Sequence, residues 1–555
     1  MVVYLARDRA FARLEFRLPK FAAIDIGSNS CRLAIAEVQQ HKLHMLHEDR
    51  EVVRLGESVF ETGLISPDAM ATTIRALKRF QKAVQTQVVD RVRVVATSAM
   101  RDAQNASAFT AWVKSELGWN VEVISGLEEG RLIHLGVTTH EPGARGRCLL
   151  IDLGGGSCEI TLSENGRVQE MVSLPLGSVR LQQEFLHTDP PSREEQNQLR
   201  TYIDRELRKL ERKFGPQAPI PLVIATSGSA AALAEASTVL AESKPAKSKG
   251  KTLIKLPARK PRNFAAHELR SALRLEPLTA NTPTVRALAA QLVTMTNEQR
   301  MAVPGIGPKR SEIIIGGAFV YAELLERLKL SGFRYSPLGL RDGILAQMLA
   351  DVDNRASVHR AIEQERWNGV LEICKRYAVD MKRAEPVRND VTRLFDDLQR
   401  VHTLSPEFRE WLAAAAMMQG VGRYVSHQGH HRHTHYLIAN SEMFGFSPAQ
   451  RALVAAIARY MGKSRPVAMD KPMRAVPVEL HTSVMQSVAL LRLAVALNQD
   501  LASDPVRFTS KVYPKRVLLQ LQVRRGSAEL ERWALRKESA YFREVFRRDL
   551  DVELA

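Results

Sequence analysis

The sequence predicts an α/β protein with two lobes of the same plan, followed by an all-helical domain and a small α+β domain. Three observations predict this arrangement. A short phrase occurs twice, as AIDIGSNS over residues 23–30 and as IDLGGGS over residues 151–157. Each copy is followed by alternating strand-like and helix-like segments, which is the pattern of a sheet covered by helices. Beyond residue 350 the hydrophobic period is helical through most of the remaining chain.

Each copy of the phrase predicts a β-hairpin whose turn is built from small residues. The expected strands cover residues 21–26 and 31–38, then 148–153 and 158–162. Glycine lets the backbone approach a ligand closely, and consecutive N–H groups in such a turn can bind an anion. Asp25 and Asp152 each lie near the end of the first strand of a hairpin, where a carboxylate can hold a cation or its water. Two such turns, one in each lobe, predict a polyphosphate held between the lobes.

The other elements of the lobes follow from the hydrophobic period and from helix-start signals. Ser66 followed by Pro67 indicates a helix start, because serine caps free N–H groups and proline suits the first helical position. The first lobe, 21–145, is expected to hold a strand pair around 41–55, a helix over 66–87, strands over 92–96 and 121–124, and a helix through 134. The second lobe, 146–340, is expected to hold a helix over 192–214, a strand over 221–225 and helices after 230 and 310. Residues 1–20 are expected to be an N-terminal extension.

The C-terminal part predicts two further domains, over 350–502 and 503–555. Helices are expected over 355–379, 385–403 and 449–460, with Pro386 in the first turn of the second. A strand is expected over 516–524, followed by mixed strand and helix over 530–549.

Composition excludes several classes of protein. The chain has 555 residues, 45% of them hydrophobic and 25% charged, which suits several globular domains. No apolar run approaches the ~18 residues that a membrane helix needs, so no membrane association is expected. Four arginines among the first twenty residues interrupt any signal-peptide core. The four cysteines form no CxxC and fall mostly in core strands, which predicts buried thiols and a cytoplasmic location.

The net charge of +18 favours a polyanionic partner. Part of this charge lies in a basic stretch over 242–262, rich in lysine and proline, which is either a solvated loop or an arm that steers a polyanion. A nucleic-acid-binding protein is the alternative from another class. It is not expected, because no binding motif accompanies the charge and aromatic residues make up only 6%.

Five motifs together resemble the exopolyphosphatase and guanosine pentaphosphate phosphohydrolase family in its long form. They are the two hairpins, TSAMRD over 97–102, ISGLEE over 124–129 and PGIGPKR over 304–310. The resemblance implies two actin-like lobes with a ribonuclease H-like fold, a helical HD-like domain and a small last domain.

The resemblance also implies a set of site residues. Glu129 would activate the attacking water, with Glu128 as the alternative, and Mg²⁺ would be held by Asp152, Glu159 and Asp25. The implied phosphate-binding residues are Asn29, Ser30, Arg101, Gly155, Gly156 and Ser157. The segments implied to contact a nucleoside include Gly228, Ser229, Gly305 and Arg310. Each role has a structural alternative. Glu129 could be a surface residue stabilised at a helix N-terminus, and Asp152 could only end its strand in an Asx turn. Glu159 could face solvent, and Arg101 could pair only with Asp102 or a nearby helix.

The implied function is that of an exopolyphosphatase, a phosphoric anhydride hydrolase that removes the terminal phosphate of inorganic polyphosphate. Hydrolysis of the 5′ phosphate of guanosine pentaphosphate (pppGpp) is the alternative, and an actin-like ATPase or kinase is a further one. Phosphoryl transfer to water needs positioning, charge neutralisation and an oriented nucleophile, and these residue types supply all three. The resemblance implies Mg²⁺ as cofactor, K⁺ as an optional activator and a homodimer.

Five histidines lie between His427 and His435, and taken alone they suggest a metal site. The resemblance to HD domains argues against one, because Gln419 and Gly420 stand at the His-Asp dipeptide, and Met461 and Asn498 stand at later ligand positions. An amide, a glycine and a thioether do not make a site for a hard divalent cation. An HD-like fold without metal chemistry is therefore expected. Phosphate binding, titration near neutral pH and a structural role stay open for the histidines.

Overall fold

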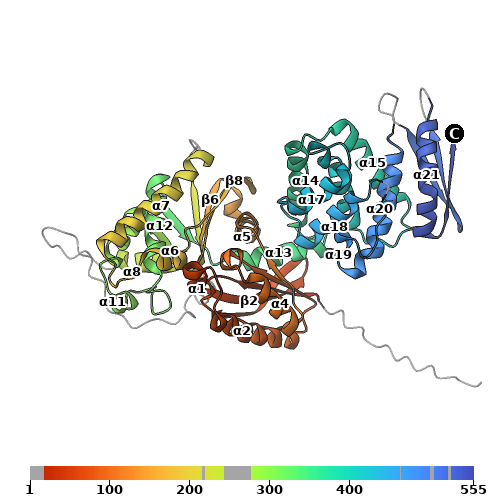
Figure 1. Ribbon diagram of the computed structural model, residues 1–555. Coiled ribbons are helices and arrows are strands. Elements are labelled where there is room, and N and C mark those ends of the chain that lie inside the picture. The colour runs from red at the N-terminus through yellow and green to blue at the C-terminus, as the bar shows by residue number, and fades with distance from the viewer. Residues whose placement is uncertain are drawn as a thin grey trace, which may run out of the picture. The chain divides into compact units, whose positions relative to one another are not determined.

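The computed structural model describes residues 18–214, 219–242, 277–462, 464–499, 506–522 and 527–554. The chain divides into two compact units between Val358 and His359 (Figure 1). Most of the expected N-terminal extension and the basic stretch beyond Glu242 lie outside the described residues. Within the described ranges, no helix has both the length and the apolar character required to span a bilayer.

The first sheet has the strand order β3-β2-β1-β4-β5. Its strands are β1 (Lys20–Ile26), β2 (Ser30–Gln39), β3 (Lys42–Val52), β4 (Arg91–Ala96) and β5 (Val121–Val123). The first three are antiparallel, and β4 and β5 add in parallel to the edge of β1. The predicted hairpin is confirmed. The expected strand pair around 41–55 is wrong, because one long strand β3 leads directly into helix α1 (Leu55–Thr62).

The second sheet repeats this topology in the order β10-β11-β9-β6-β7-β8. Its strands are β6 (Cys148–Leu153), β7 (Cys158–Glu164), β8 (Arg167–Leu174), β9 (Leu222–Thr226), β10 (Thr279–Asn281) and β11 (Gly332–Tyr335). The run β8-β7-β6-β9 matches β3-β2-β1-β4 strand for strand, so the duplication extends from the motif to the fold. Strands β10 and β11 are too short to show a hydrophobic period in the sequence. Strand β8 carries exposed polar residues, so it lacks the run of apolar residues that would have predicted it.

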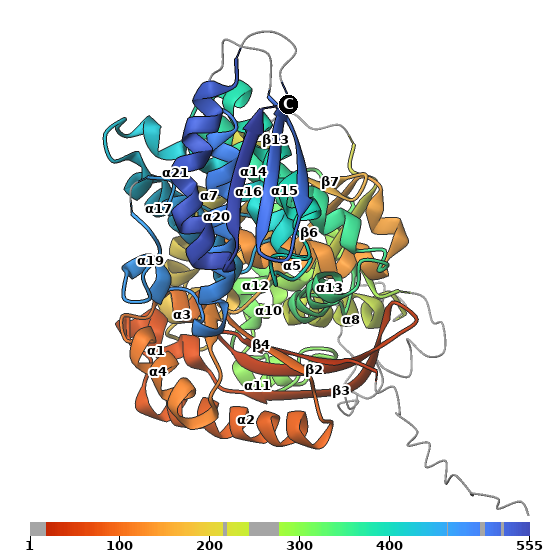
Figure 2. The same cartoon turned by 90° about the vertical axis from the view of Figure 1, so that its right-hand side faces the viewer.

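Helices cover both faces of the first sheet, and Figure 2 shows α2 and α13 on opposite sides of it. The helices of this part are α2 (Pro67–Thr86), α3 (Ser98–Asp102), α4 (Ala106–Leu117), α5 (Gly126–His140), the 3-10 turn η1 (Pro142–Arg145) and α13 (Leu340–Val352). Ser66 caps α2 as predicted, its hydroxyl accepting from the N–H of Ala69 at 3.2 Å. Helix α5 begins as expected but continues to His140.

Helices α5 and α13 pack together through glycines. A Cβ on Gly343 would lie 1.8 Å from the carbonyl oxygen of Leu132, so the two backbones are nearly in contact. We expect Gly343→Ala to force the helices apart and to lower the free energy of unfolding by about 1–3 kcal/mol, measured by chemical denaturation. Gly339→Ala is the matched control, because its Cβ would meet nothing within 4 Å. Equal stability of the two variants would contradict this account of the packing.

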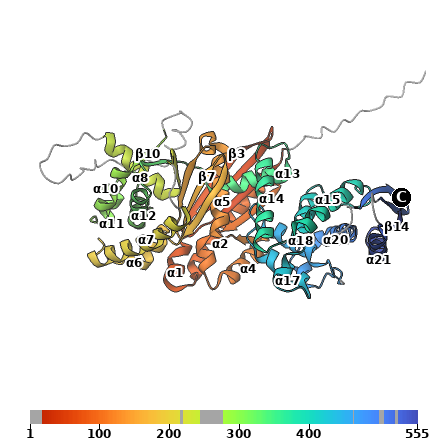
Figure 3. The same ribbon diagram turned by 90° about the horizontal axis from the view of Figure 1, so that it is seen from above.

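Helices lie beside the second sheet (Figure 3), and their apolar side chains join its buried core. They are α6 (Ser178–Phe185), α7 (Arg193–Phe214), α8 (Ser227–Glu242), α10 (Thr282–Leu292), α11 (Asn297–Met301) and α12 (Ile314–Arg327). The predicted long helix α7 is confirmed within one residue at its start. All four cysteines of the chain are buried, as predicted.

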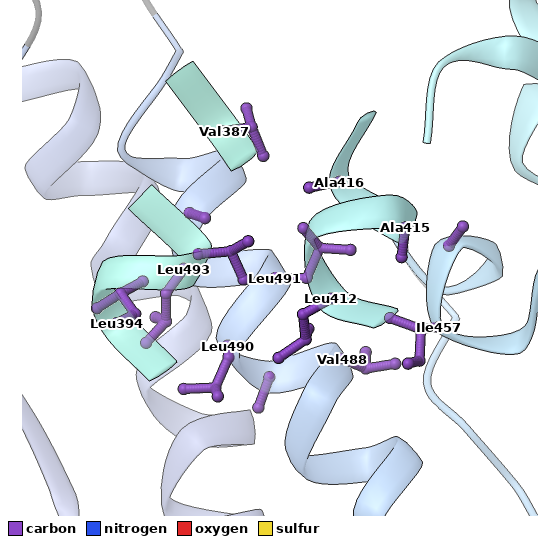
Figure 4. Packing of buried hydrophobic residues seen from close by; sticks show 14 of the residues in the cluster. Val387, Leu394, Leu412, Ala415, Ala416, Ile457, Val488, Leu490, Leu491 and Leu493 are labelled. Carbon is purple, nitrogen blue, oxygen red and sulfur yellow. The ribbon is translucent and has the colours of Figure 1, made fainter. Parts of the chain in front are cut away.

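The second unit is a helical bundle joined to a three-stranded sheet. Its helices are α14 (His359–Arg376), α15 (Met381–Asp397), α16 (Phe408–Met418), η2 (Val421–Tyr424), α17 (His430–Asn440), α18 (Pro448–Arg459), α19 (Lys471–Arg474), η3 (Val478–Leu480), α20 (His481–Ala496) and α21 (Glu529–Phe546). The strands β12 (Arg507–Val512), β13 (Arg516–Gln522) and β14 (Asp549–Leu554) form the sheet. Figure 4 shows how leucine, isoleucine, valine and alanine side chains of α15, α16, α18 and α20 fill the core between them.

Two expectations for this unit are wrong. Pro386 lies inside α15 rather than in its first turn, because the helix already begins at Met381 behind the cap Asp380. Residues 530–549 are not mixed strand and helix. Up to Phe546 they form the single helix α21, whose apolar face packs on the sheet, and the last three residues lead into β14.

Candidate active site

The two hairpin turns lie close to each other within the first unit. Each turn closes with the same hydrogen bond, from Gly27 N–H to the Ser30 carbonyl at 3.1 Å and from Gly154 N–H to the Ser157 carbonyl at 2.9 Å. A Cβ on Gly155 would lie only 3.3 Å from the backbone nitrogen of Asn29. Glycine is needed at this position because the two backbones approach so closely.

The carbonyl groups of the second turn are occupied by the start of helix α6. The N–H groups of Ser178 and Val179 donate to the carbonyls of Gly154 and Gly155 at 3.0 and 2.8 Å. In the first turn, the N–H groups of Val53 and Gly56 donate in the same way to the carbonyls of Asn29 and Ser28, at 3.0 and 2.7 Å. With their carbonyls bound on one side, the turns present N–H groups on the other.

The amides of Gly155 and Gly156 are the clearest example. Neither N–H has a hydrogen-bond acceptor among the residues that the structure describes. Unpaired adjacent N–H groups on a small-residue turn form a concave site suited to a phosphate oxygen. The phosphate site that the duplicated phrase predicts thus has the donors it needs.

Three carboxylates converge beside the second turn. Asp152 and Glu159 are cross-strand neighbours on β6 and β7, and Glu129 comes from the first turn of α5. One oxygen of each lies within 4.8 Å of the others. Glu129 is 7% exposed and Glu159 2% exposed, so the expectation that Glu159 might face solvent is wrong.

Two glycines allow α5 to approach the sheet this closely. A Cβ on Gly126 would lie 2.1 Å from the Ser173 hydroxyl oxygen, and one on Gly130 would lie 2.9 Å from the sulfur of Met171. The Ser173 hydroxyl donates to Glu159 Oε1 at 2.7 Å and holds that carboxylate in place. The glycine spacing on one helix face therefore sets the position of Glu129.

Burial and mutual repulsion raise the pKa values of these carboxyl groups. Burial raises the pKa of Glu129 to about 7, although Arg101 acts in the opposite direction. Burial, with Glu129 and Asp152 adding to it, raises the pKa of Glu159 well above its usual range. Burial also raises the pKa values of Asp152 and Asp25. A cation bound near these four carboxyl groups would favour their ionised forms.

Two carboxylate oxygens here have no protein partner. Asp25 Oδ1 and Glu159 Oε2 are buried and accept no hydrogen bond from the described residues. Buried polar atoms without partners are rare in folded proteins and often mark the place of a ligand. Carboxylate oxygens are the preferred ligands of hard divalent cations. Asp152, Glu159, Glu129 and Asp25 are the residues that could hold such an ion.

Arg101, on α3, links Glu129 to the second turn. Its Nη1 donates to Glu129 Oε2 and to the carbonyl of Ile124, both at 2.9 Å, and its Nη2 approaches the Ser157 hydroxyl at 3.4 Å. The alternative that Arg101 pairs only with Asp102 is wrong, since Asp102 pairs with Arg180.

Glu128 points to a different partner from Glu129. Its carboxylate accepts from Arg131 Nε at 2.8 Å and from Nη2 at 2.9 Å, and Arg131 also donates to Gln347 of α13 at 2.5 Å. Arg131 is only 1% exposed. Glu128 therefore belongs to the contact between two helices, while Glu129 belongs to the carboxylate cluster.

The two hairpins differ in the charge of the residue that lies opposite the aspartate of the first strand. Asp152 faces Glu159 across its hairpin, but the equivalent Asp25 faces Arg32. Arg32 in turn lies opposite Arg50 on β3, an unfavourable like-charge pair unless an anion lies nearby. The hairpin of the second lobe thus pairs two carboxylates that can bind a cation, whereas the hairpin of the first lobe adds an arginine that can bind an anion.

Further basic residues join Arg32 from other elements. Burial lowers the pKa of Arg50 to about 10, and the positive charges of Arg32 and Arg341 add to this effect. Burial, followed by Arg50 and Arg32, lowers the pKa of Arg310 to about 9. The sequence analysis missed Arg32, Arg50 and Arg341. Only the even spacing of Ser30 and Arg32 along one strand could have indicated that they share a face.

Comparison with known proteins identifies the relationship. The sequence profile of the Ppx/GppA phosphatase family matches residues 34–352, and that of Ppx/GppA phosphatase domain III matches residues 366–543. The chain belongs to the Ppx/GppA phosphatase family. The domain III match supports the long form of the family, as the motifs predicted.

Solved structures of Ppx/GppA proteins resemble the chain. An exopolyphosphatase from Cytophaga hutchinsonii is 25% identical, with a TM-score of 0.51, over 60% of this chain and 99% of that one. An exopolyphosphatase-like protein is 26% identical, with a TM-score of 0.50, over 61% and 98%. A family member from Aquifex aeolicus is 28% identical, with a TM-score of 0.46, over 60% and 98%. Together with the repeated sheets, the family matches confirm the predicted fold class: actin-like α/β lobes, then a helical domain and a small α+β region.

The four residues implied for nucleoside contact differ from one another in their surroundings. A Cβ on Gly228 would lie 1.4 Å from Arg310 Nη2, so the Arg310 guanidinium rests directly on the start of α8. Ser229 is 2% exposed and packs against Gly317 of α12. Gly305, with a φ of +86°, packs on α8. Arg310 is thus beside the arginine group, whereas Ser229 and Gly305 serve packing, and their nucleoside contact stays a prediction.

The HD-like positions of domain III have structural partners. Asn498 Nδ2 donates to Asp390 Oδ2 at 2.7 Å, and the Gln419 carbonyl accepts from the Thr434 hydroxyl at 3.0 Å. The rings of His430 and His431 lie 3.8 Å apart at the start of α17. In the part of the chain that the structure describes, the histidines bring no three ligand atoms within 4.8 Å of one another.

Proposed function

We propose that this Ppx/GppA phosphatase is an exopolyphosphatase that hydrolyses the terminal phosphoric anhydride of inorganic polyphosphate. The observation that carries the proposal is the buried Glu129 with a pKa of about 7, placed between a carboxylate pair and a turn with free N–H groups. The similar protein from Cytophaga hutchinsonii is an exopolyphosphatase, which supports the proposal.

The proposed roles follow from the contacts. The N–H groups of Gly155 and Gly156 bind oxygens of the terminal phosphate, and Arg101 offsets its charge. Glu129 accepts a proton from the attacking water as the new P–O bond forms and the bridging P–O bond breaks. The shortened chain leaves with the bridging oxygen. A base with a pKa near the working pH is well matched to this step.

The carboxylates fit Mg²⁺, and we propose that Asp152 and Glu159 hold it with Asp25 on the facing hairpin. Bound there, Mg²⁺ would offset phosphate charge and favour the ionised carboxylates. Arg32, Arg50 and Arg310 would receive the next phosphates of the chain. The same group could receive the phosphates of pppGpp, because Arg310 lies on the segment implied to contact a nucleoside, and this is the second candidate.

The direct test measures phosphate release from long-chain polyphosphate and, in parallel, from pppGpp, each with Mg²⁺ or with EDTA. We expect Mg²⁺-dependent release from polyphosphate. Release from pppGpp alone would move the function to the nucleotide branch of the family. Release from neither, by protein that is folded and binds phosphate, would refute both candidates.

The proton-accepting role predicts a specific pH dependence. Glu129 must be ionised, so at fixed Mg²⁺ the value of kcat/KM should fall about tenfold per pH unit below its pKa. Arg101 lowers that pKa, so Arg101→Gln should raise it and move the acid limb of the profile to higher pH. Arg93→Gln is the control, because Arg93 is a buried arginine of the same lobe that pairs with Glu122 outside the cluster. An unmoved profile in Arg101→Gln would argue against Glu129 as the base.

A further inference from the structure

Arg180, in the first turn of α6, makes an unusual number of contacts for a residue outside the carboxylate cluster. Its Nε donates to the Gly156 carbonyl of the phosphate-binding turn at 2.9 Å. Its own backbone N–H donates to the Gly155 carbonyl at 3.0 Å. Arg180 therefore bonds the carbonyls of two successive peptide groups of the turn, on the side opposite their N–H groups.

The same guanidinium also bonds the first lobe. Its Nη2 pairs with Asp102 and lies 3.3 Å from the Ser98 hydroxyl, both on α3. The plane of the guanidinium lies over the ring of Phe60 of α1, 4.1 Å from its centroid. The Arg180 side chain is 14% exposed. One side chain thus joins a turn of the second lobe to two helices of the first.

These contacts leave Arg180 poorly placed to bind substrate. Its Nη1 approaches Glu184 at 3.4 Å, and Phe60 covers one face of the group. The turn beside it is equally constrained, because a Cβ on Gly177 would lie 2.2 Å from the backbone carbon of Gly156. Rotation of the Gly155–Gly156 and Gly156–Ser157 peptide groups is opposed from this side, which fixes the directions of the Gly156 and Ser157 N–H groups.

We propose that Arg180 is a positioning residue that couples contact between the lobes to the orientation of the phosphate-binding turn. When Asp102, Ser98 and Phe60 hold the guanidinium, its Nε is fixed against the Gly156 carbonyl and the turn amides are preorganised. When the lobe contact is lost, the turn loses this support. Preorganised donors contribute to catalysis because they need not reorient during the reaction. This inference concerns the proposed phosphatase site and rests on it.

The first test does not depend on activity. Hydrogen exchange, followed by mass spectrometry without substrate, compares wild type, Arg180→Lys and Asp102→Asn. Lysine keeps the charge but cannot bond Gly156 and Asp102 with one planar fork. We expect amide exchange in the peptide spanning residues 153–158 to quicken at least about tenfold in both variants, with strands β6 and β9 unchanged. Glu184→Gln is the matched control, since it removes only the contact within α6. Unchanged exchange in the turn would overturn the proposal.

The second test uses phosphate release. We expect Arg180→Lys to lower kcat for polyphosphate by about 10–100-fold, with an unmoved pH profile because Glu129 is untouched. In Arg180→Ala, added guanidinium ion should restore part of the activity, and ammonium ion should not. Equal kcat in wild type and Arg180→Lys would refute the positioning role. If the wild type released no phosphate, the proposed function would fail, while the exchange experiment would still decide on the positioning.

Discussion

Glu129→Gln is expected to lower kcat for phosphate release by at least about 10²-fold, because the amide cannot accept a proton from the attacking water. The fold should survive. Glu129 lies among carboxylates that repel it, and burial disfavours its ionised form. Removing the charge should therefore leave the melting temperature unchanged or raise it. Steady-state kinetics and thermal unfolding of the same preparation measure the two effects.

Glu128→Gln provides the matched control, one residue away on the same helix. Its carboxylate holds the buried Arg131. Losing the charge weakens that pair and should cost about 1–3 kcal/mol of stability, with little change in kcat. The two neighbours should thus separate chemistry from stability. A large kcat loss in Glu128→Gln with full activity in Glu129→Gln would reverse the assignment.

Asp152→Asn and Glu159→Gln are expected to raise the Mg²⁺ concentration for half-maximal activity by about tenfold or more, because each removes a hard anionic ligand. Direct binding, measured by calorimetry with Mg²⁺ or Mn²⁺, should weaken in parallel. In wild type, Mg²⁺ should raise the melting temperature, since a ligand that binds the folded state stabilises it. The variants should lose most of that rise.

Glu164→Gln is the control for the metal prediction. Glu164 lies at the end of the same strand as Glu159, pairs with Arg147 at 3.4 Å and is 43% exposed. It should leave Mg²⁺ affinity unchanged. Equal Mg²⁺ dependence in wild type, Asp152→Asn and Glu159→Gln would show that the carboxylate cluster is not the metal site.

Local sequence determined much of this protein. The small-residue turns, the aspartates near the strand ends and the cap Ser66 depend on residues close along the chain, so their patterns are visible in the sequence. The repeated phrase was enough to predict two lobes of one plan. Strands of three or four residues, and the polar strand β8, have no such pattern.

Tertiary structure decided the chemistry of individual residues. Glu128 and Glu129 are equivalent by local pattern, and only the packing of α5 against α13 and the sheet gives them different partners. Arg180 lies 78 positions from Asp102, so no local rule connects them. The pKa of Glu129 depends on burial by distant strands and on Arg101. Sequence patterns specify conformation over a few residues, whereas charge and burial depend on contacts that form only when the two lobes come together.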